Sequence, residues 1–410
     1  MSGVCDELKG RLEVNALESY FQPIYNLRTG QIIGVEALLR PLTVSGDHLA
    51  PAILFHEAEM SGCLLDLERE ARLVALKTFS TELPDRDLIL FLNYSSALID
   101  SGGLDPDRIL STVRHYGLAV RNVAMETVES GAQSMEELST FSRSIRRAGF
   151  LISLDNFGTE HSSLERVALL RPDIVKIDRS IIDGVHESPR KRSVLRSIAY
   201  LARTIGALCL AQGLERYEDL AVCATEGVDL AQGFLLGRPA PTLEAALKRQ
   251  ETTATPHFDL LEQDLRDQLR LRSDAFAAIH AKVDEVVTTL SECNAGALDG
   301  ELERILLDLA IFDAGYVLEP DGTQVTRTVV TRGRKRPERH PIFHPAPIGT
   351  NHRLKDYAYG PGALDHERFI TAPYLSTNSG ELCRTISRRF TTKDRRELIV
   401  CVDIPEEGDQ

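Results

Sequence analysis

Apolar runs and helix-period patterns alternate along the first part of the chain. Short apolar runs, typical of buried strands, end in polar residues and are followed by stretches with apolar positions at helical spacing. Strands are predicted at 17–27, 31–39, 88–93, 122–126, 150–155, 172–178, 207–212 and 229–232. Helices are predicted at 51–80 in two pieces, 105–116, 134–148, 162–170, 190–205 and 216–226.

This alternation predicts an α/β fold with a parallel sheet and helical crossovers. The number of repeats and their length fit a (β/α) barrel better than an open sheet of six strands. A turn at Arg28-Thr-Gly30 joins the first two strands as a hairpin. One strand of the barrel is therefore expected to run antiparallel.

The pattern changes after the last predicted strand. Pro239-Ala-Pro241 and a second Thr/Pro-rich stretch ending at Pro256 indicate a boundary. The pattern over 257–292 predicts a long amphipathic helix. This helix either connects two domains or forms a dimer contact, or it packs on its own domain. Further elements follow as a helix at 300–312 and strands at 316–322, 368–375, 382–387 and 397–403. We expect a barrel over 1–250, a helical linker over 251–300 and an α+β domain over 301–410.

Polar side chains recur at the ends of the apolar strands. Strand ends meet at one face of a (β/α) barrel, where active sites are built. A shared site explains this recurrence better than solvated surface does. The residues are Glu36, Asn93, Glu126, Asp155, Lys176 with Asp178, Gln212 with Glu215, and Gln232.

The predicted cluster has the chemistry of a hard metal ion and a phosphate ester. Three carboxylates and the Asn93 amide give oxygen ligands without Cys or His, which suits Mg²⁺, Mn²⁺ or Ca²⁺. Lys176 is placed to neutralise a phosphate or to hold an attacking water, and Arg40 to grip phosphate. The alternative is a buried ion-pair network with no ligand.

The net charge and the cysteine content indicate which partners and which cellular compartment to expect. A net charge of −14 over 410 residues argues against a nucleic-acid backbone or an anionic membrane. The basic stretch at 332–340 is therefore interpreted as a solvated loop. The seven cysteines include no CxxC pair, which favours reduced thiols in a cytosolic protein. With no signal-peptide pattern and no apolar run of about 18 residues, a cytoplasmic chain without a membrane span is expected.

Several motifs in this order resemble those of the EAL-domain family, the phosphodiesterases that linearise cyclic di-GMP. The resemblance covers residues 12–248 and rests on many ordered matches. They are Phe21-Gln-Pro-Ile-Tyr25, Glu36-Ala-Leu-Leu-Arg-Pro41, Phe91-Leu-Asn-Tyr-Ser95, Glu126-Thr-Val-Glu129, Asp155-Asn-Phe-Gly-Thr159, Ser162-Ser-Leu164, Val175-Lys-Ile-Asp178 and Gln232-Gly-Phe-Leu-Leu-Gly-Arg-Pro239.

The resemblance implies a modified TIM (β/α)8 barrel, a homodimer, and Mg²⁺ or Mn²⁺, with Ca²⁺ as an inhibitory or binding-only ion. It implies metal ligands at Glu36, Asn93, Glu126 and Asp155, and catalytic roles for Lys176, which would orient the attacking water, and Glu215. It implies a loop-bracing role for Glu129. The nucleotide site would be lined by Gln22, Leu38, Arg40, Asp178, Gln232 and Pro239.

The departures from the family pattern concern catalysis. Asn156 stands where the family has a second Asp, and Gln212 where it has a Glu. Glu160 and His161 replace the Gly and Tyr of the following loop. An amide keeps one ligating oxygen, but it lacks charge and cannot accept a proton. These two carboxylates are lost from the half of the site where a second metal ion and the general base would act. A mechanism that uses both is therefore expected to be weakened.

The C-terminal part resembles PAS- or Cache-like sensor folds, and the domain order resembles the YkuI type of EAL protein. Such a domain either binds a small ligand or dimerises. Three hypotheses follow for the whole chain: a cyclic di-GMP receptor with weak or absent hydrolysis, an active phosphodiesterase that produces linear pGpG, and an interaction scaffold that needs no nucleotide.

Overall fold

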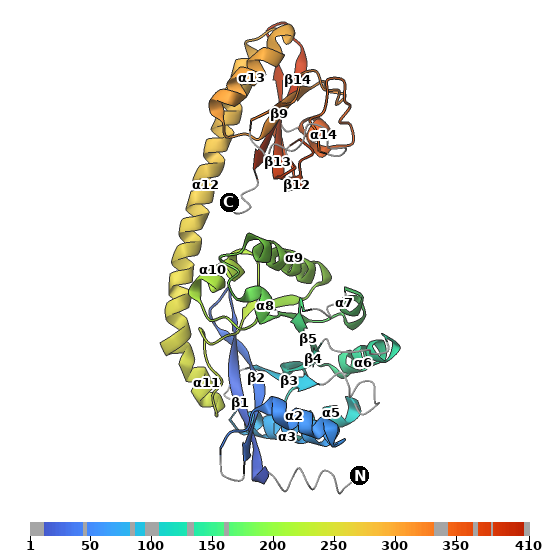
Figure 1. Ribbon diagram of the computed structural model, residues 1–410, viewed down its shortest axis with the longest axis vertical. Coiled ribbons are helices and arrows are strands. Elements are labelled where there is room, and N and C mark those ends of the chain that lie inside the picture. Colours follow the sequence, from blue (N-terminus) through green and yellow to red (C-terminus); the bar gives the residue numbers. More distant parts are fainter. Residues whose placement is uncertain are drawn as a thin grey trace. The chain divides into compact units, whose positions relative to one another are not determined.

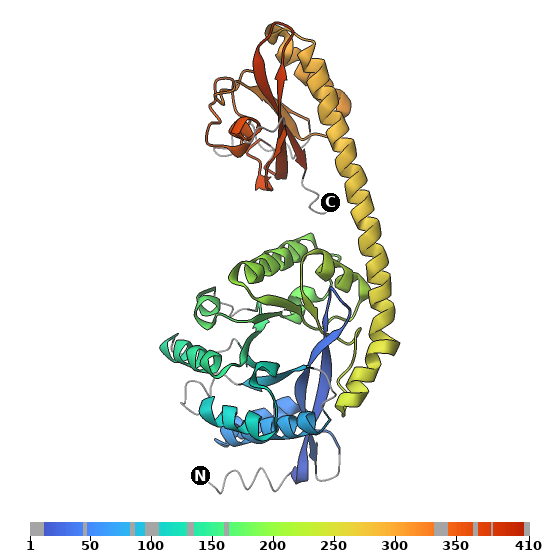
Figure 2. The ribbon, with the colours of Figure 1, turned by 180° about the vertical axis from the view of Figure 1, so that it is seen from behind.

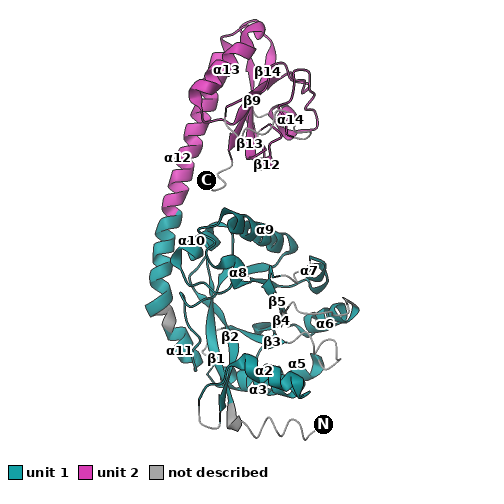
Figure 3. Ribbon diagram, in the orientation of Figure 1, with its two compact units in different colours: residues 1–265 teal, residues 266–410 magenta. Residues whose placement is uncertain are grey.

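The computed structural model describes residues 12–43, 47–82, 87–94, 106–128, 135–159, 164–331, 343–363, 368–378 and 380–405 (Figure 1). The chain divides into two compact units, residues 1–265 and residues 266–410 (Figure 3). Each unit has its own hydrophobic cores. The basic stretch at 332–340 lies outside the described residues.

Unit 1 is a closed barrel of eight strands that follow one another in sequence order. This confirms the predicted irregular (β/α) barrel. The strands are β1 (Leu12–Asn26), β2 (Ile32–Thr43), β3 (Ile89–Tyr94), β4 (Val123–Val128), β5 (Leu151–Phe157), β6 (Ile174–Ile177), β7 (Leu208–Ala211) and β8 (Leu230–Ala231).

The opening hairpin gives the barrel its antiparallel strand. β1 pairs antiparallel with both of its neighbours, β2 and β8, whereas β2 to β8 are parallel to one another. The hairpin register sets Gln22 opposite Glu36. Gly34 lets β2 approach β3, because a Cβ at this position would lie 2.3 Å from the carbonyl oxygen of Ile89.

Helices flank the barrel strands in both views (Figure 1 and Figure 2). Their apolar faces pack on the outer faces of the strands in one large cluster that includes Phe79, Val113, Ile145 and Leu195. The helices are α2 (Pro51–Met60), α3 (Leu64–Glu82), α5 (Pro106–His115), α6 (Met135–Ala148), α7 (Leu164–Leu170), α8 (Arg179–Ile182), α9 (Pro189–Ile205), α10 (Tyr217–Thr225) and α11 (Leu243–Arg249), with a 3₁₀ turn η1 (Val120–Asn122) and a π turn η2 (Gln250–Ala254).

Unit 2 is built on an antiparallel sheet in the order β10-β9-β14-β13-β11, with β12 also paired to β13. The predicted strand at 368–375 is two strands, because Pro373 has no N–H to donate and the pairing is interrupted there. The strands are β9 (Ala314–Leu318), β10 (Val329–Val330), β11 (Arg368–Ile370), β12 (Tyr374–Leu375), β13 (Leu382–Thr391) and β14 (Glu397–Pro405).

One helix belongs to both units. α12 (Thr255–Ser291) begins in unit 1 and ends in unit 2. In unit 2 its end packs with α13 (Leu298–Leu309), which follows the 3₁₀ turn η3 (Ala295–Ala297), and with the sheet. α14 (Asp356–Ala363) was not expected, since it contains Gly360 and Pro361. The division into parts at 250 and 300 stays a prediction.

Two further expectations from composition can be compared with the structure. The described cysteines, Cys63, Cys209, Cys223, Cys293, Cys383 and Cys401, are free thiols, and all but Cys293 are buried. Among the helices in the described ranges, none combines the length and the apolar character that a membrane crossing requires.

Asp403 is an acid in the core of unit 2. It is 0% exposed and accepts hydrogen bonds from Thr385 Oγ1 at 2.8 Å and Asn378 Nδ2 at 3.3 Å. Burial raises the pKa of this carboxyl to about 6, because desolvation penalises the charged form. The unfolded pKa is about 4, so the folded state holds an extra proton between these pH values. The stability that this group allows is complete below about pH 4 and falls as pH rises through 6.

We predict that Asp403→Asn removes this pH dependence. Above pH 6 the variant should be more stable than the wild type by about 2–3 kcal/mol, since no charge is then buried. Urea unfolding of unit 2 between pH 4.5 and pH 8 measures the difference. Asp274→Asn on the exposed part of α12 is the control, and equal pH slopes in wild type and Asp403→Asn would contradict the interpretation.

Candidate functional site

The strand-end residues point into the barrel because of the two-residue period of β-strands. A small apolar cluster fills the barrel interior, with Ile24, Phe91, Ala124, Ile174, Leu210 and Leu230 as its buried members. On each of these strands, the residue two positions away from the apolar cluster member, toward one common end of the barrel, has a polar side chain on the same face. These polar residues are Gln22, Asn93, Glu126, Lys176, Gln212 and Gln232. Glu36 and Asp155 stand in the same relation to Gly34 and Ser153.

Lys176 is the centre of this layer. Its side chain is 0% exposed, and its Nζ lies 2.6 Å from Glu126 Oε1, 3.2 Å from Glu36 Oε2 and 3.4 Å from Asp155 Oδ1. Three carboxylates from β2, β4 and β5 therefore share one ammonium from β6. The predicted cluster is thus brought together, with the lysine at its centre.

The charges of the cluster depend on one another. Burial by itself would lower the pKa of Lys176, but Asp155, Glu126 and Glu36 outweigh it and hold the pKa above its ordinary value. Burial raises the pKa of Glu126 well above its ordinary value, and Lys176 offsets only part of this effect. For Glu36, burial would also raise the pKa, but Lys176 and hydrogen bonds from Gln232 and Asn93 lower it below the ordinary value.

Amide side chains donate hydrogen bonds to two of the three carboxylates, Glu36 and Asp155. Gln232 Nε2 donates to Glu36 Oε2 at 2.8 Å and to Gln22 Oε1 at 3.3 Å. Asn93 Nδ2 donates to Glu36 Oε1 at 3.3 Å. Gln212 Nε2 donates to Asp155 Oδ1 at 2.9 Å. The amide at position 212 therefore holds a carboxylate that the resemblance assigns to a metal ion.

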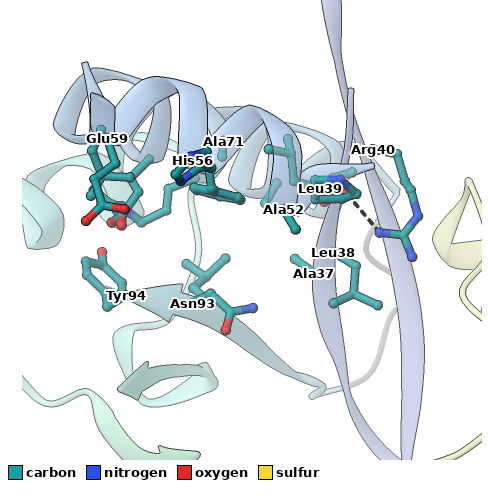
Figure 4. A pocket seen from close by; sticks show the side chains of 18 residues that line it. Ala37, Leu38, Leu39, Arg40, Ala52, His56, Glu59, Ala71, Asn93 and Tyr94 are labelled. Carbon is teal, nitrogen blue, oxygen red and sulfur yellow. Dashed lines mark hydrogen bonds and ion pairs between the residues drawn. The ribbon is translucent and has the colours of Figure 1, made fainter. Parts of the chain in front are cut away.

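Two pockets border the cluster. The smaller, of about 130 Å³, is lined by the side chains of Gln22, Glu36, Gln212, Glu215 and Gln232, together with Arg179 and Phe234. The larger, of about 710 Å³, lies between β2, β3, α2 and α3 and includes Leu38, Arg40 and Asn93 (Figure 4). In this view Arg40 lies at one side, and Glu59 and Tyr94 lie at the other. Asn93 lines the larger pocket and bonds to Glu36, which lines the smaller.

The remaining predicted residues have other positions. Arg40 donates to the carbonyl oxygen of Leu39 at 2.8 Å, and its guanidinium lies 5.7 Å from the ring centre of Tyr20. Asp178 caps α8, accepting from Ser180 N at 2.9 Å. Pro239 is half-buried and is in the described lining of neither pocket. The predicted loop residue Glu129, like Glu160 and His161, lies outside the described residues.

Asn156 has a left-handed backbone conformation. Its φ is 56°, and its carbonyl oxygen accepts from Thr159 Oγ1 at 3.1 Å. Asn and Asp tolerate this region better than other residues with a side chain. The backbone at this position therefore accepts an amide or a carboxylate equally, and the choice between them is one of chemistry.

The donor set suits a hard divalent cation, although the carboxylates are turned toward Lys176. Within the described ranges, no three His, Cys, Asp or Glu side chains form a ready metal-binding group. However, Glu126 Oε2 is buried and has no hydrogen-bond partner in the described part of the chain. A buried carboxylate oxygen of this kind needs a cation or a proton. The residues therefore fit an oxygen-coordinated metal ion that would compete with Lys176 for them.

Sequence reasoning missed two residues of the smaller pocket, Arg179 and Phe234. Arg179 directly follows Asp178, and Phe234 lies two residues after Gln232. Both stand just beyond a strand end, where loops turn into the barrel mouth. The signals in the sequence were their closeness to predicted site residues and, for Phe234, its place within the motif Gln232-Gly-Phe-Leu-Leu-Gly-Arg-Pro239.

We predict that Lys176→Met destabilises the chain by about 3–5 kcal/mol, because three buried carboxylates lose their shared cation. Thermal unfolding measures this loss. Added Ca²⁺ should raise the melting temperature of the variant more than that of the wild type, since the ion then replaces the ammonium. Lys282→Met, at an exposed ion pair on α12, is the control. A Ca²⁺ response no larger than that of the wild type would refute the competition between ion and lysine.

The chain was compared with known proteins. The sequence profile of the EAL domain matches residues 6–239. An EAL-domain protein of Bacillus subtilis, YkuI, is 26% identical over 403 residues, covering 94% of this chain and 93% of YkuI. An uncharacterized Sinorhizobium fredii protein, y4lL, is 31% identical over 249 residues. The chain spans only 28% of that relative's length.

Solved structures agree with the fold. The crystal structure of YkuI in complex with substrate cyclic di-GMP and calcium superimposes with a TM-score of 0.77, at 23% identity, and covers 99% of this chain and 100% of that one. A cyclic di-GMP complex of the PaMucR phosphodiesterase has a TM-score of 0.54 at 26% identity, covering 59% of this chain and 99% of that one. Because the family match spans more than half of the sequence, the chain belongs to the EAL-domain family.

Proposed function

We propose that the protein is a cyclic di-GMP-binding signalling protein in which hydrolysis is weak or absent. The observation that carries the proposal is the Gln212–Asp155 hydrogen bond beside an otherwise complete set of Glu36, Asn93, Glu126 and Asp155. The cyclic di-GMP complexes of YkuI and PaMucR support the choice of ligand. The proposed function is that of these 410 residues, and it is not extended to the longer relatives.

The proposed metal-binding part of the site consists of three carboxylates and one amide. Glu36, Asn93, Glu126 and Asp155 would hold Mg²⁺ or Mn²⁺, or Ca²⁺ as a binding-only ion. Such an ion supplies positive charge at the phosphate and polarises it. With all three carboxylates ionised, as binding of the metal ion requires, these groups and one ammonium carry two net negative charges, which one divalent cation neutralises. Asn156 and Gln212 add no charge for a second ion.

The chain's own residues can bind and orient a nucleotide but lack a base at position 212. Gln212 donates its N–H to Asp155 and cannot accept a proton at pH 7. Lys176 remains an ammonium, held by three carboxylates, and its role toward water stays a prediction. Gln22 and Gln232 line the smaller pocket and would contact the ligand there.

An active phosphodiesterase is the second candidate, and one observation favours it. Glu215 keeps a carboxylate in the same pocket as Gln212. If this group accepts the proton in place of position 212, the chain turns over cyclic di-GMP to linear pGpG. A scaffold that needs no nucleotide is the third candidate, and it predicts no binding at all.

The second unit would act as a PAS- or Cache-like module that senses a small ligand or dimerises the chain. Its antiparallel sheet with flanking helices is consistent with that resemblance. A homodimer in the cytoplasm remains part of the proposal.

Binding and turnover separate the three candidates. Titration calorimetry of the full chain with cyclic di-GMP and Ca²⁺ should show binding, and Arg40→Ala should weaken it. Incubation with Mg²⁺ or Mn²⁺ should then give little or no linear product. No binding at high micromolar ligand would overturn the receptor proposal, and sustained turnover would favour the active enzyme.

We predict that Asn156→Asp combined with Gln212→Glu raises turnover by at least about a hundredfold, because both carboxylates and a general base are restored. Product formation with Mg²⁺ or Mn²⁺ measures the gain. Gln263→Glu on the exposed face of α12 adds a carboxylate away from the site and is the control. Equal turnover in the double variant and the wild type would mean that these two positions do not limit catalysis.

We also predict a metal stoichiometry of about one divalent ion per chain, because Glu36, Asn93, Glu126 and Asp155 form one set of oxygen ligands. The double variant Asn156→Asp with Gln212→Glu should bind about two. Calorimetric titration with Mn²⁺ in the presence of cyclic di-GMP counts the ions. Two ions in the wild type would show that amide oxygens suffice for the second site.

A further inference from the structure

The smaller pocket contains a cation that neither the family resemblance nor the strand-end pattern assigns. Among the described residues that line it, Arg179 is the only cation, and it faces Gln22, Gln212, Gln232, Glu36 and Glu215. All except Glu215 belong to the layer around Lys176. A guanidinium therefore lines the same pocket as Gln212, which stands where the family pattern has a Glu.

The stem of Arg179 is held in position by its neighbours. Asp178 caps α8 and fixes the backbone directly before it. Gly213, at φ 72°, leaves room for the side chain, because a Cβ there would lie 2.7 Å from Arg179 Cγ. The aliphatic part of Arg179 is thus packed on the loop after β7. Only the guanidinium group can therefore move from one hydrogen-bond partner to another.

That partner is Glu215, and the ion pair between them is weak enough to be exchanged. Arg179 NH1 lies 3.0 Å from Glu215 Oε1, and the two side chains are 53% and 39% exposed. Exposed pairs of this kind contribute at most a small part of the stability. A phosphate group, by contrast, accepts two parallel hydrogen bonds from a guanidinium. A phosphodiester entering the pocket can therefore take Arg179 from Glu215 at little cost.

We propose that Arg179 binds a phosphodiester of the nucleotide, exchanging Glu215 for it, and so supplies positive charge to the phosphodiester that does not lie at the metal ligands. The inference rests on the proposed function, because the ligand is cyclic di-GMP, which has two phosphodiester groups. One of them would lie at the cluster around Lys176, and the other at Arg179. Arg179 is a binding residue in this scheme and carries out no proton transfer.

The charge of the pocket is consistent with this assignment. With Glu at 212 and Asp at 156, added carboxylates would repel a phosphate unless a second ion neutralised them. With Gln212 in the lining, position 212 adds no negative charge beside the guanidinium. The amide at position 212 and the presence of Arg179 therefore both favour a phosphate group in this pocket.

The test compares binding of cyclic di-GMP by four forms of the full chain. Calorimetry with Ca²⁺ is run on the wild type, Arg179→Ala, Arg179→Lys and Arg216→Ala. The last is the matched control, since Arg216 is similarly exposed, follows Glu215 and pairs with Asp183 at 3.6 Å outside the described lining of the pocket. Arg179→Ala should bind about ten- to a hundredfold more weakly, Arg179→Lys should recover part of the loss, and Arg216→Ala should bind as the wild type does.

Two additional readouts distinguish a phosphate contact from a structural effect. The affinity of Arg179→Ala should fall less steeply with salt than that of the wild type, because one ionic contact is missing. Glu215→Gln should bind a few-fold more tightly than the wild type, since it frees Arg179 from its competitor. An unchanged salt dependence, or weaker binding by Glu215→Gln, would overturn the exchange.

The outcomes separate this inference from the proposed function. If the wild type does not bind cyclic di-GMP, the proposed function itself fails. If the wild type binds and Arg179→Ala binds equally well, only the role of Arg179 fails. If Arg216→Ala loses as much affinity as Arg179→Ala, the effect is a general one of surface charge, and the assignment is wrong.

Discussion

One buried ammonium holds the barrel's polar layer together. Three carboxylates converge on Lys176 from three other strands, and none of the four side chains is more than 11% exposed. Without the ammonium, repulsion between these acids in a low dielectric would oppose closure of the barrel end. The apolar cluster in the barrel interior packs next to the polar layer and excludes water from one side of it. The two-residue period of the strands directs the polar side chains into the barrel. The same contact that permits folding therefore places the groups that would bind a metal ion.

The sequence was sufficient to predict the barrel and the members of this layer. Apolar runs that ended at Asn93 or Glu126 identified both a strand and the end of the strand at which the site would form. The opening hairpin was predictable from Arg28-Thr-Gly30. These features are local, and each can be recognised from a few neighbouring residues.

Other parts of the site depend on contacts that no local pattern contains. The sequence does not show that Gln212 donates to Asp155, or that Arg179 reaches Glu215, because these pairs join residues from separate strands and loops. Short elements such as α8 and the split strand at 368–375 were missed for a related reason. A helix of one turn has no period, and the interruption at Pro373 depends on its sheet partners.

The backbone at Asn156 has a consequence for how this site can change. Its left-handed conformation suits an amide and a carboxylate of the same shape, so an exchange between them leaves the loop as it is. Position 212 differs, because Gln212 Nε2 donates to Asp155 Oδ1 and a glutamate could not. The two positions therefore respond differently to a carboxylate. The loop at position 156 keeps its backbone conformation, whereas a glutamate at position 212 removes the hydrogen-bond donor of Asp155 and sets two carboxylates side by side.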